Sequence, residues 1–156
     1  MISQTAEYAL RAIVFLARHD DPSTTAEIAR ATHVPGGYLS KVMQSLCRSG
    51  LVRSQRGLHG GFTLVRAVKE LTVLDVVNAV DPIQRIRTCP LGLEAHSEHL
   101  CPLHRQLDNA VALVEEAFQS TTIDDLLTTR PRKRACRFPC LSGPPPSPGA
   151  PDRPVR

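Results

Sequence analysis

Apolar residues recur at helical spacing in the first third of the chain. Over residues 3–18 they fall at i, i+3, i+4, i+7 and i+8, which predicts a long helix whose apolar face is made of Ala9, Ala12, Ile13, Leu16 and Ala17. After a turn, either Thr24 or Thr25 is placed to cap a second, shorter helix that runs to about residue 32.

A third helix is predicted to begin near Gly37 and to end before Gly50, which suits the C′ position. Two short β-type runs follow, over residues 51–55 and 61–65, and they flank a glycine-rich tip that carries Arg56. Two short helices about four residues apart, the second more basic than the first, followed by a basic hairpin, are typical of a winged helix-turn-helix. The alternative is a small α+β domain that binds no ligand.

Beyond the hairpin the pattern returns to helices. Thr72 is placed to cap a helix through Val80, with Asp75 at the capping-box distance. A long helix is predicted over residues 102–120, and its apolar residues follow a 4-4-3-4 spacing that forms a narrow seam of Leu103, Leu107, Val111, Val114 and Phe118. The seam suits either a partner helix or the core of a monomer. Because two-fold DNA readers need a partner, a homodimer is favoured.

These elements predict a mainly α fold with a small β-hairpin wing and a long dimerisation helix. The expected organisation is a winged helix-turn-helix domain over residues 1–81, a cysteine- and histidine-containing sensor loop over 82–101, and a dimerisation segment over 102–128 whose last short helix is capped by Thr121 or Thr122. Residues 130–156 hold eight of the thirteen prolines and show no periodicity. We therefore expect a disordered basic tail over 129–156.

The net charge of +4 conceals a strong pattern. Residues 28–69 carry seven basic side chains and no acidic one, whereas residues 70–129 carry three basic and ten acidic side chains. An acid-free window of this length is typical of a surface that binds a polyanion, and within a winged helix it indicates double-stranded DNA. A winged-helix module that binds protein instead is the less favoured alternative, since it would not need such a window.

The predicted DNA-reading residues lie on the third helix and the hairpin tip. Glycine near the helix start allows the backbone to approach phosphates, and the polar side chains that follow reach phosphates or base edges. A cation at the tip suits a phosphate or a narrow minor groove. The predicted set is Pro35, Gly36, Gly37, Tyr38, Ser40, Lys41, Gln44, Arg48, Arg56 and His59.

Several classes of protein are disfavoured. No apolar run is long enough to span a bilayer, and the start mixes apolar and charged residues, so we expect a cytoplasmic protein without membrane association. Five cysteines without an export signal favour thiols, metal binding or redox sensing over a disulfide framework. No nucleophile motif or phosphate-binding loop is present, so we do not expect an enzyme.

Residues 88–104 concentrate potential ligands. Cys89 and Cys101 are separated by eleven residues, and His104 follows Cys101 within one helical turn; His96 and His99 lie between the two cysteines. Thiolate and imidazole together suit zinc or an iron–sulfur cluster, although this spacing is not that of a zinc finger.

Three stretches of the sequence together resemble one family. TAEYALRAIVFLA, YLSKVMQSLCRSGLVRSQRGLHGGFTL and LTVLDVVNAVD are similar to the iron–sulfur winged-helix repressors typified by the regulators IscR and NsrR, and the resemblance covers about residues 1–128. It implies a homodimeric repressor that binds pseudo-palindromic promoter DNA. It also implies a cluster held by three cysteines, typically with five residues between neighbours, at the start of the dimerisation helix.

This sequence keeps the outer cysteines of that pattern, Cys89 and Cys101, but has Ala95 at the middle position. The resemblance then implies a [2Fe–2S] cluster held by the two cysteines, by His96 or His104, and by Glu7 of the partner subunit. Two alternatives remain open: a zinc site, or a cluster-free sensor in which the two thiols are oxidised directly. In each case a change in ligation would shift the dimer helix and the DNA affinity.

Overall fold

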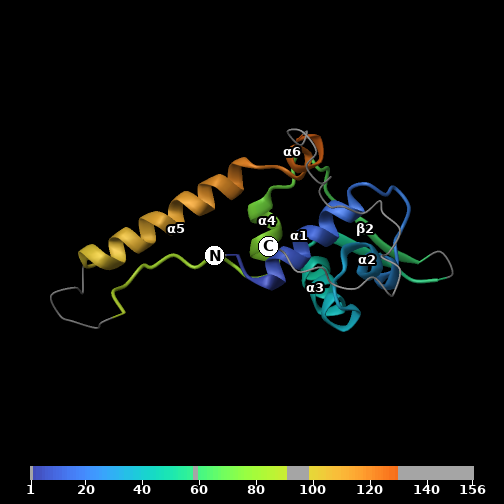
Figure 1. Ribbon diagram of the computed structural model, residues 1–156, viewed down its shortest axis with the longest axis horizontal. Coiled ribbons are helices and arrows are strands. Elements are labelled where there is room, and N and C mark those ends of the chain that lie inside the picture. Colours follow the sequence, from blue (N-terminus) through green and yellow to red (C-terminus); the bar gives the residue numbers. More distant parts are fainter. Residues whose placement is uncertain (1, 58–59, 91–98, 130–156) are drawn as a thin grey trace, which may run out of the picture.

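The elements follow one another in the predicted order. The computed structural model describes residues 2–57, 60–90 and 99–129. They form α1 (Gln4–Leu16), α2 (Thr25–Thr32), α3 (Gly36–Arg48), β1 (Val52–Gln55), β2 (Gly61–Leu64), α4 (Val73–Val80), α5 (Pro102–Ser120) and α6 (Ile123–Thr128) (Figure 1). The mainly α fold with a β-hairpin wing is therefore confirmed. Among the described residues, no helix has the length and apolar character needed to cross a membrane.

Three helices begin with the same local device. Thr24, Thr72 and Thr122 each accept a hydrogen bond from the backbone N–H three residues ahead, and an acidic side chain at that position bonds back to the backbone of the threonine. These capping boxes satisfy two otherwise unpaired groups at each helix start. The sequence left two alternatives open at two of these starts, and the structure selects Thr24 over Thr25 and Thr122 over Thr121.

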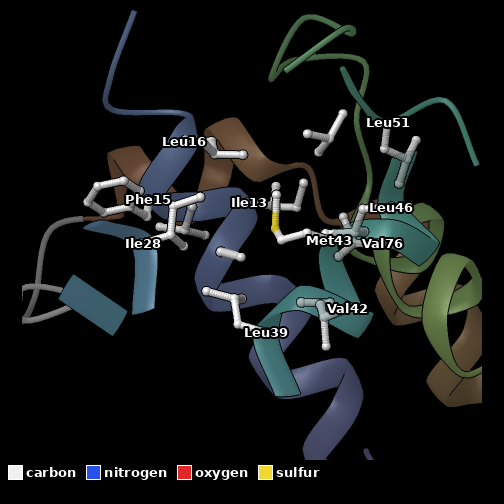
Figure 2. Close-up of a cluster of buried hydrophobic side chains, with 14 of the residues drawn as sticks. Ile13, Phe15, Leu16, Ile28, Leu39, Val42, Met43, Leu46, Leu51 and Val76 are labelled. Carbon is white, nitrogen blue, oxygen red and sulfur yellow. The ribbon is translucent and has the colours of Figure 1, made fainter. Parts of the chain in front are cut away.

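The core is built around α1, which contacts α2, α3, α4 and α6. The largest fully buried side chains include Ile13 of α1, Ile28 of α2, and Leu39, Met43 and Leu46 of α3 (Figure 2). Burial of α1 on several sides explains why its predicted apolar face carries the small residues Ala9 and Ala12, which let neighbouring helices approach. The apolar positions predicted in the first half of the chain therefore pack together in one core shared by α1, α2 and α3.

The wing is a two-stranded antiparallel hairpin in which Val52 pairs with Leu64 and Gln55 pairs with Gly61. It is attached to the helices by a short bridge, since Ser23 and Phe62 exchange backbone hydrogen bonds of 3.1 and 2.8 Å. A Cβ added to Gly61 would lie 2.7 Å from the Ser23 backbone. Glycine at this position is therefore required for the wing to approach the helices so closely.

The long helix α5 differs from the rest because none of its residues is buried. It extends away from the other helices and joins them near its C-terminal end (Figure 1), where Phe118 packs against a small cluster that includes Val73 and Val77 of α4. The chain then returns, and Ile123 of α6 is fully buried in the main core. We call α1–α4, the hairpin and α6, residues 2–80 and 121–129, the head.

Candidate functional site

The polar face of α3 is exposed along its whole length. Gly37, Lys41, Gln44 and Arg48 are exposed at helical spacing, whereas Leu39, Val42, Met43 and Leu46 on the opposite side are buried. The helix begins at Gly36, one residue earlier than expected, with Pro35 as its N-cap. All the predicted α3 reading residues are therefore available on the surface of the head.

The start of α3 suits a phosphate. Pro35 supplies no side-chain cap, so no side chain occupies the N–H groups of the first turn. A Cβ added to Gly36 or Gly37 would meet no atom within 4 Å. The fold therefore does not require glycine at either position, in contrast to Gly61, and both leave the backbone open to close approach by a ligand.

Tyr38 is held in place by α1. Its hydroxyl hydrogen-bonds with the Thr5 hydroxyl, and its ring meets the Tyr8 ring edge to face with centroids 5.6 Å apart. The Arg11 guanidinium lies 5.8 Å from the centroid of the Tyr8 ring. The first turn of α3 is therefore coupled directly to the first two turns of α1. Ser40 is also partly engaged, because its hydroxyl donates to the Gly36 carbonyl at 3.0 Å.

The hairpin adds exposed cations beside α3. Arg56 is exposed at the tip and is followed by Gly57, whose φ of +116° requires glycine. Arg53 and Gln55 of β1 are exposed as well. Sequence reasoning did not select these two, although their place in an acid-free strand was a signal for them. His59, which was predicted to read DNA, lies outside the described residues.

Three of the predicted ligands come together at the start of α5. The ligand atoms of Cys89, Cys101 and His104 all lie within 4.8 Å of one another. His104 Nδ1 is 3.2 Å from the Cys101 sulfur and 3.6 Å from the Cys89 sulfur. Cys101 is buried and the other two are half-buried. Two thiols and one imidazole at this separation are a donor set that fits a soft or borderline metal ion.

Helix geometry fixes two of the three ligands. Cys101 is the N-cap of α5, Pro102 occupies the first helical position, and His104 follows in the same turn. Proline is favoured at that position because its missing N–H would have no partner there. The Cys-Pro-Leu-His run therefore both starts the helix and places a sulfur and an imidazole nitrogen side by side.

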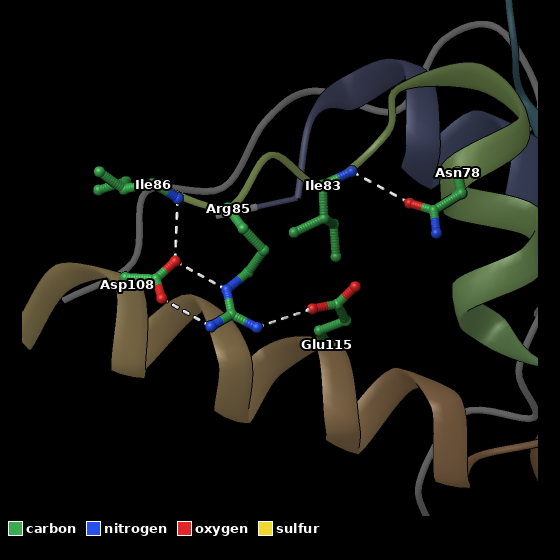
Figure 3. A network of polar contacts seen from close by, with 6 residues as sticks. All are labelled: Asn78, Ile83, Arg85, Ile86, Asp108 and Glu115. Atoms are coloured by element: carbon green, nitrogen blue, oxygen red, sulfur yellow. Dashed lines mark hydrogen bonds and ion pairs between the residues drawn. The ribbon is translucent and has the colours of Figure 1, made fainter. Parts of the chain in front are cut away.

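The third ligand arrives on a different segment, residues 82–90, which we call the strap. Arg85 donates from Nε and Nη2 to both carboxylate oxygens of Asp108 at 2.7 and 2.6 Å, and from Nη1 to Glu115 at 3.3 Å (Figure 3). The Ile86 N–H also donates to Asp108, at 2.9 Å, and the Ile83 N–H donates to the Asn78 side chain of α4. The strap is therefore tied both to α4 and to α5.

The ion pair between Arg85 and Asp108 shifts the pKa values of both side chains. The Arg85 guanidinium holds the pKa of Asp108 at about 2, below its usual 3.8, and Asp108 in turn raises the pKa of Arg85. Sequence reasoning missed this ion pair, because Arg85 and Asp108 are far apart in the sequence and belong to no motif.

The other candidate ligands lie elsewhere. Glu7 is exposed in the first turn of α1, where it forms an ion pair with Arg11 one turn ahead. His96 and Ala95 lie outside the described residues, and His99 is exposed. Cys47 of α3 is half-buried, and burial raises the pKa of its thiol. A raised pKa leaves less of this thiol in the thiolate form, which is the reactive one, at neutral pH.

Three helices ending in an exposed basic recognition helix, a β-hairpin wing and a projecting helix define a winged-helix transcription regulator. The family model Rrf2, described as an iron-dependent transcriptional regulator, matches residues 2–129, and the chain belongs to this family. It is a DNA-binding regulator of transcription and not an enzyme. The resemblance inferred from the three sequence stretches is thereby confirmed.

Individual relatives agree with this assignment. The chain is 34% identical over 134 residues to Protein aau3 of Rhizobium meliloti, covering 84% of this chain and 87% of that protein. CymR, the global cysteine regulator of B. subtilis, has a similar structure, with a TM-score of 0.66, 26% identity, and coverage of 81% of this chain and 95% of that one. T. potens IscR shares the fold, with a TM-score of 0.67 at 23% identity over 81% and 85% of the two chains.

Proposed function

We propose that this chain is a homodimeric repressor of the cytoplasm whose affinity for pseudo-palindromic promoter DNA is set by a metal centre at Cys89, Cys101 and His104. The observation that carries the proposal is the convergence of these three ligand atoms within 4.8 Å at the start of α5. A [2Fe–2S] cluster is the favoured occupant, and a single zinc ion is the alternative.

The donor set supports a resident group of this kind. Two sulfur ligands and one imidazole suit iron–sulfur clusters with mixed ligation as well as tetrahedral zinc. Both occupants need a fourth ligand besides these three. In the proposal it comes from Glu7 of the partner subunit or from His96 of the same chain. When bound, a cluster would supply a redox-active centre whose charge and coordination change on oxidation or on loss of iron.

The exposed face of α5 supports the homodimer. Three residues of its predicted seam, Leu103, Leu107 and Val114, are 62%, 47% and 44% exposed. Large apolar side chains gathered on one exposed side of a helix favour burial against a second apolar surface. Pairing of two seams about a two-fold axis would bury both stripes and set the two heads at a fixed separation.

The position of the metal centre supports a link between occupancy and DNA affinity. Cys89 lies on the strap that leaves α4 of the head, and the other two ligands lie at the start of α5. A group bound to all three joins the head's exit segment to the dimer helix. Gain or loss of that group changes how firmly each head is fixed on the dimer, and with it the spacing of the two α3 helices.

The first test is composition after anaerobic purification: the visible absorption spectrum together with iron, sulfide and zinc analysis. The favoured form predicts a coloured protein with iron and sulfide in equal amounts. Cys89→Ala, Cys101→Ala and His104→Ala should each lose the chromophore, whereas Cys47→Ala should keep it. A colourless protein with one zinc per chain would select the alternative, and absence of any bound metal would refute both.

The second test addresses the reading face. Lys41→Ala removes a cation placed for phosphate, so it should weaken binding to all DNA sequences alike and reduce the slope of log affinity against log salt by about 1. Gln44→Ala should instead relax preference at one base position, at a cost of about 1–3 kcal/mol. Anisotropy titrations with DNA from the protein's own promoter region, at several salt concentrations, measure both. Unchanged salt slope in Lys41→Ala would contradict the assigned face.

A further inference from the structure

The ion pair between the strap and α5 joins two segments that contribute no side chain to the main apolar core of the head. Arg85 and Asp108 lie outside the two clusters of buried apolar residues, and α5 itself has no buried residue. Yet the contact is extensive: one carboxylate accepts two hydrogen bonds from the guanidinium and a third from the Ile86 backbone. The Asp108 side chain is only 15% exposed. Such a contact fixes both the position and the orientation of the strap.

The contact also sets the register between the strap and α5. Asp108 follows His104 by four residues on α5, which is one helical turn, so the two side chains lie on the same face about 6 Å apart along the axis. Cys89 follows Arg85 by four residues, and an extended chain spans at most about 13 Å in that length. The two segments run in opposite directions, so fixing Arg85 opposite Asp108 brings Cys89 level with His104.

This register matters because metal coordination tolerates little error. A slip of the strap by one residue would move Cys89 by about 3.3 Å, whereas ligand distances in a metal site are held to about 0.2 Å. Cys101 and His104 need no such help, because the first turn of α5 places them. Of the three ligands, Cys89 alone depends on a separate segment being held in place.

We propose that Arg85 and Asp108 are positioning residues that hold Cys89 at the metal centre, with Glu115 as a weaker support for the guanidinium. The inference rests on the proposed metal centre and adds to it the element that makes the third ligand available. Neither residue contacts the metal in this proposal. Loss of the ion pair leaves the two ligands of α5 in place and the strap tied only to α4, through Ile83. The end of the strap that carries Cys89 is then no longer held against α5, so two ligands of this chain remain at the site in place of three.

Anaerobic titration of the metal-free full-length protein with cobalt(II) tests the inference. The intensity of the near-ultraviolet thiolate-to-cobalt band reports how many sulfurs bind the ion. Wild-type protein should show the band of two thiolates. Asp108→Asn and Arg85→Gln should show the weaker band of Cys89→Ala, and their cobalt affinity should be about 10–100-fold lower than that of wild type, as expected for residues that orient a ligand.

Three comparisons separate positioning from loss of structure. Glu116→Gln removes an exposed acidic side chain from the same helix and should behave as wild type. Arg85→Lys keeps the charge but loses the two-fold pairing, so it should restore only part of the affinity. The double variant Arg85→Gln with Asp108→Asn should be no worse than either single one, because the two residues act as a unit. Circular dichroism of the apo proteins should be the same throughout.

The possible results have distinct meanings. Wild-type-like bands and affinities in both Asp108→Asn and Arg85→Gln would overturn the positioning role while leaving the metal centre intact. A weaker band accompanied by loss of helical signal in the apo protein would also overturn it, in favour of a general structural role. Wild-type protein without any thiolate-to-cobalt band would overturn the proposed function itself, and this inference with it.

Discussion

The head and the long helix are held in place by different kinds of interaction. The head has a continuous apolar core in which Ile13, Leu39 and Met43 are completely buried. By contrast, α5 buries none of its residues and adds only Phe118 to a small apolar cluster. An ion pair and hydrogen bonds tie it to the strap. Apolar burial is non-directional and strong, whereas polar contacts at a partly exposed surface are weak but specific in geometry. The first suits a stable reading unit, and the second suits a joint that responds to a ligand.

The largest expected effect is in the core of the head. Leu46→Ala should lower the free energy of unfolding by about 2–5 kcal/mol, because a fully buried leucine leaves a cavity. Val65→Ala, at a side chain 58% exposed, is the matched control and should change it by less than about 0.5 kcal/mol. Urea denaturation measures both. Similar small effects at the two positions would mean that the head lacks the core described here.

The next largest effect is on association of the two chains through α5, with the head remaining folded. Leu107→Lys combined with Val114→Lys places two charges in the exposed seam, so the dimer should dissociate, at a loss of about 0.7–1.5 kcal/mol for each apolar side chain whose exposed half is no longer covered. Sedimentation velocity should show a monomer. The circular dichroism spectrum should keep the signal of the head's helices. A variant that stays dimeric would show that another surface carries the association.

A smaller effect contrasts two glycines. Gly61→Ala forces a Cβ to within 2.7 Å of the Ser23 backbone, so the wing must shift, at a cost of about 1–3 kcal/mol. Gly37→Ala meets no atom within 4 Å and lies in a helix, so it should stabilise the protein by about 0.5–1 kcal/mol while weakening DNA binding. Thermal unfolding and DNA titration distinguish the two. Unimpaired DNA binding by Gly37→Ala would contradict close backbone approach at α3.

The smallest expected effect is a pH dependence at the strap. The folded-state pKa of Asp108 is about 2, below the ordinary 3.8, so the ion pair contributes stability that is fully present above about pH 4. That stability is lost as the pH falls from about 4 to 2. The difference in melting temperature between wild type and Asp108→Asn should therefore shrink over this interval. A difference that stays constant from pH 5 to pH 2 would show that the charge of Asp108 is not involved.

The sequence predicted the head well because local signals and the apolar pattern agree there. Thr72, followed by Asp75 three positions later, marked the start of α4, and Gly50 marked the end of α3, where its φ is +70°. The exposed polar residues of α3 followed directly, because a helix with one buried face leaves only the opposite face to the solvent. The uncertainty about the N-cap of α2, Thr24 or Thr25, amounted to a single residue.

The contact between the strap and α5 could be predicted only in part. Cys101 and His104 lie within one helical turn, so their proximity follows from local geometry. Cys89 joins them through a strap that has no helix or strand period, held by Arg85 and Asp108. No periodicity or motif marks an ion pair between residues that far apart in the chain. Equally, the exposed seam of α5 was visible in the pattern, but the pattern alone does not distinguish a partner helix from a monomer core.

The most direct test of the central claim measures DNA affinity with and without the metal centre. Anisotropy titrations should compare anaerobically purified protein with the same protein after chelation, using DNA from its own promoter region, in wild type and in Cys101→Ala. We predict that the two wild-type forms differ in affinity by about 5–150-fold, the usual range for coupling between two sites, and that the two Cys101→Ala preparations do not differ. Equal affinities for the loaded and stripped wild-type protein would contradict control of DNA binding through Cys89, Cys101 and His104.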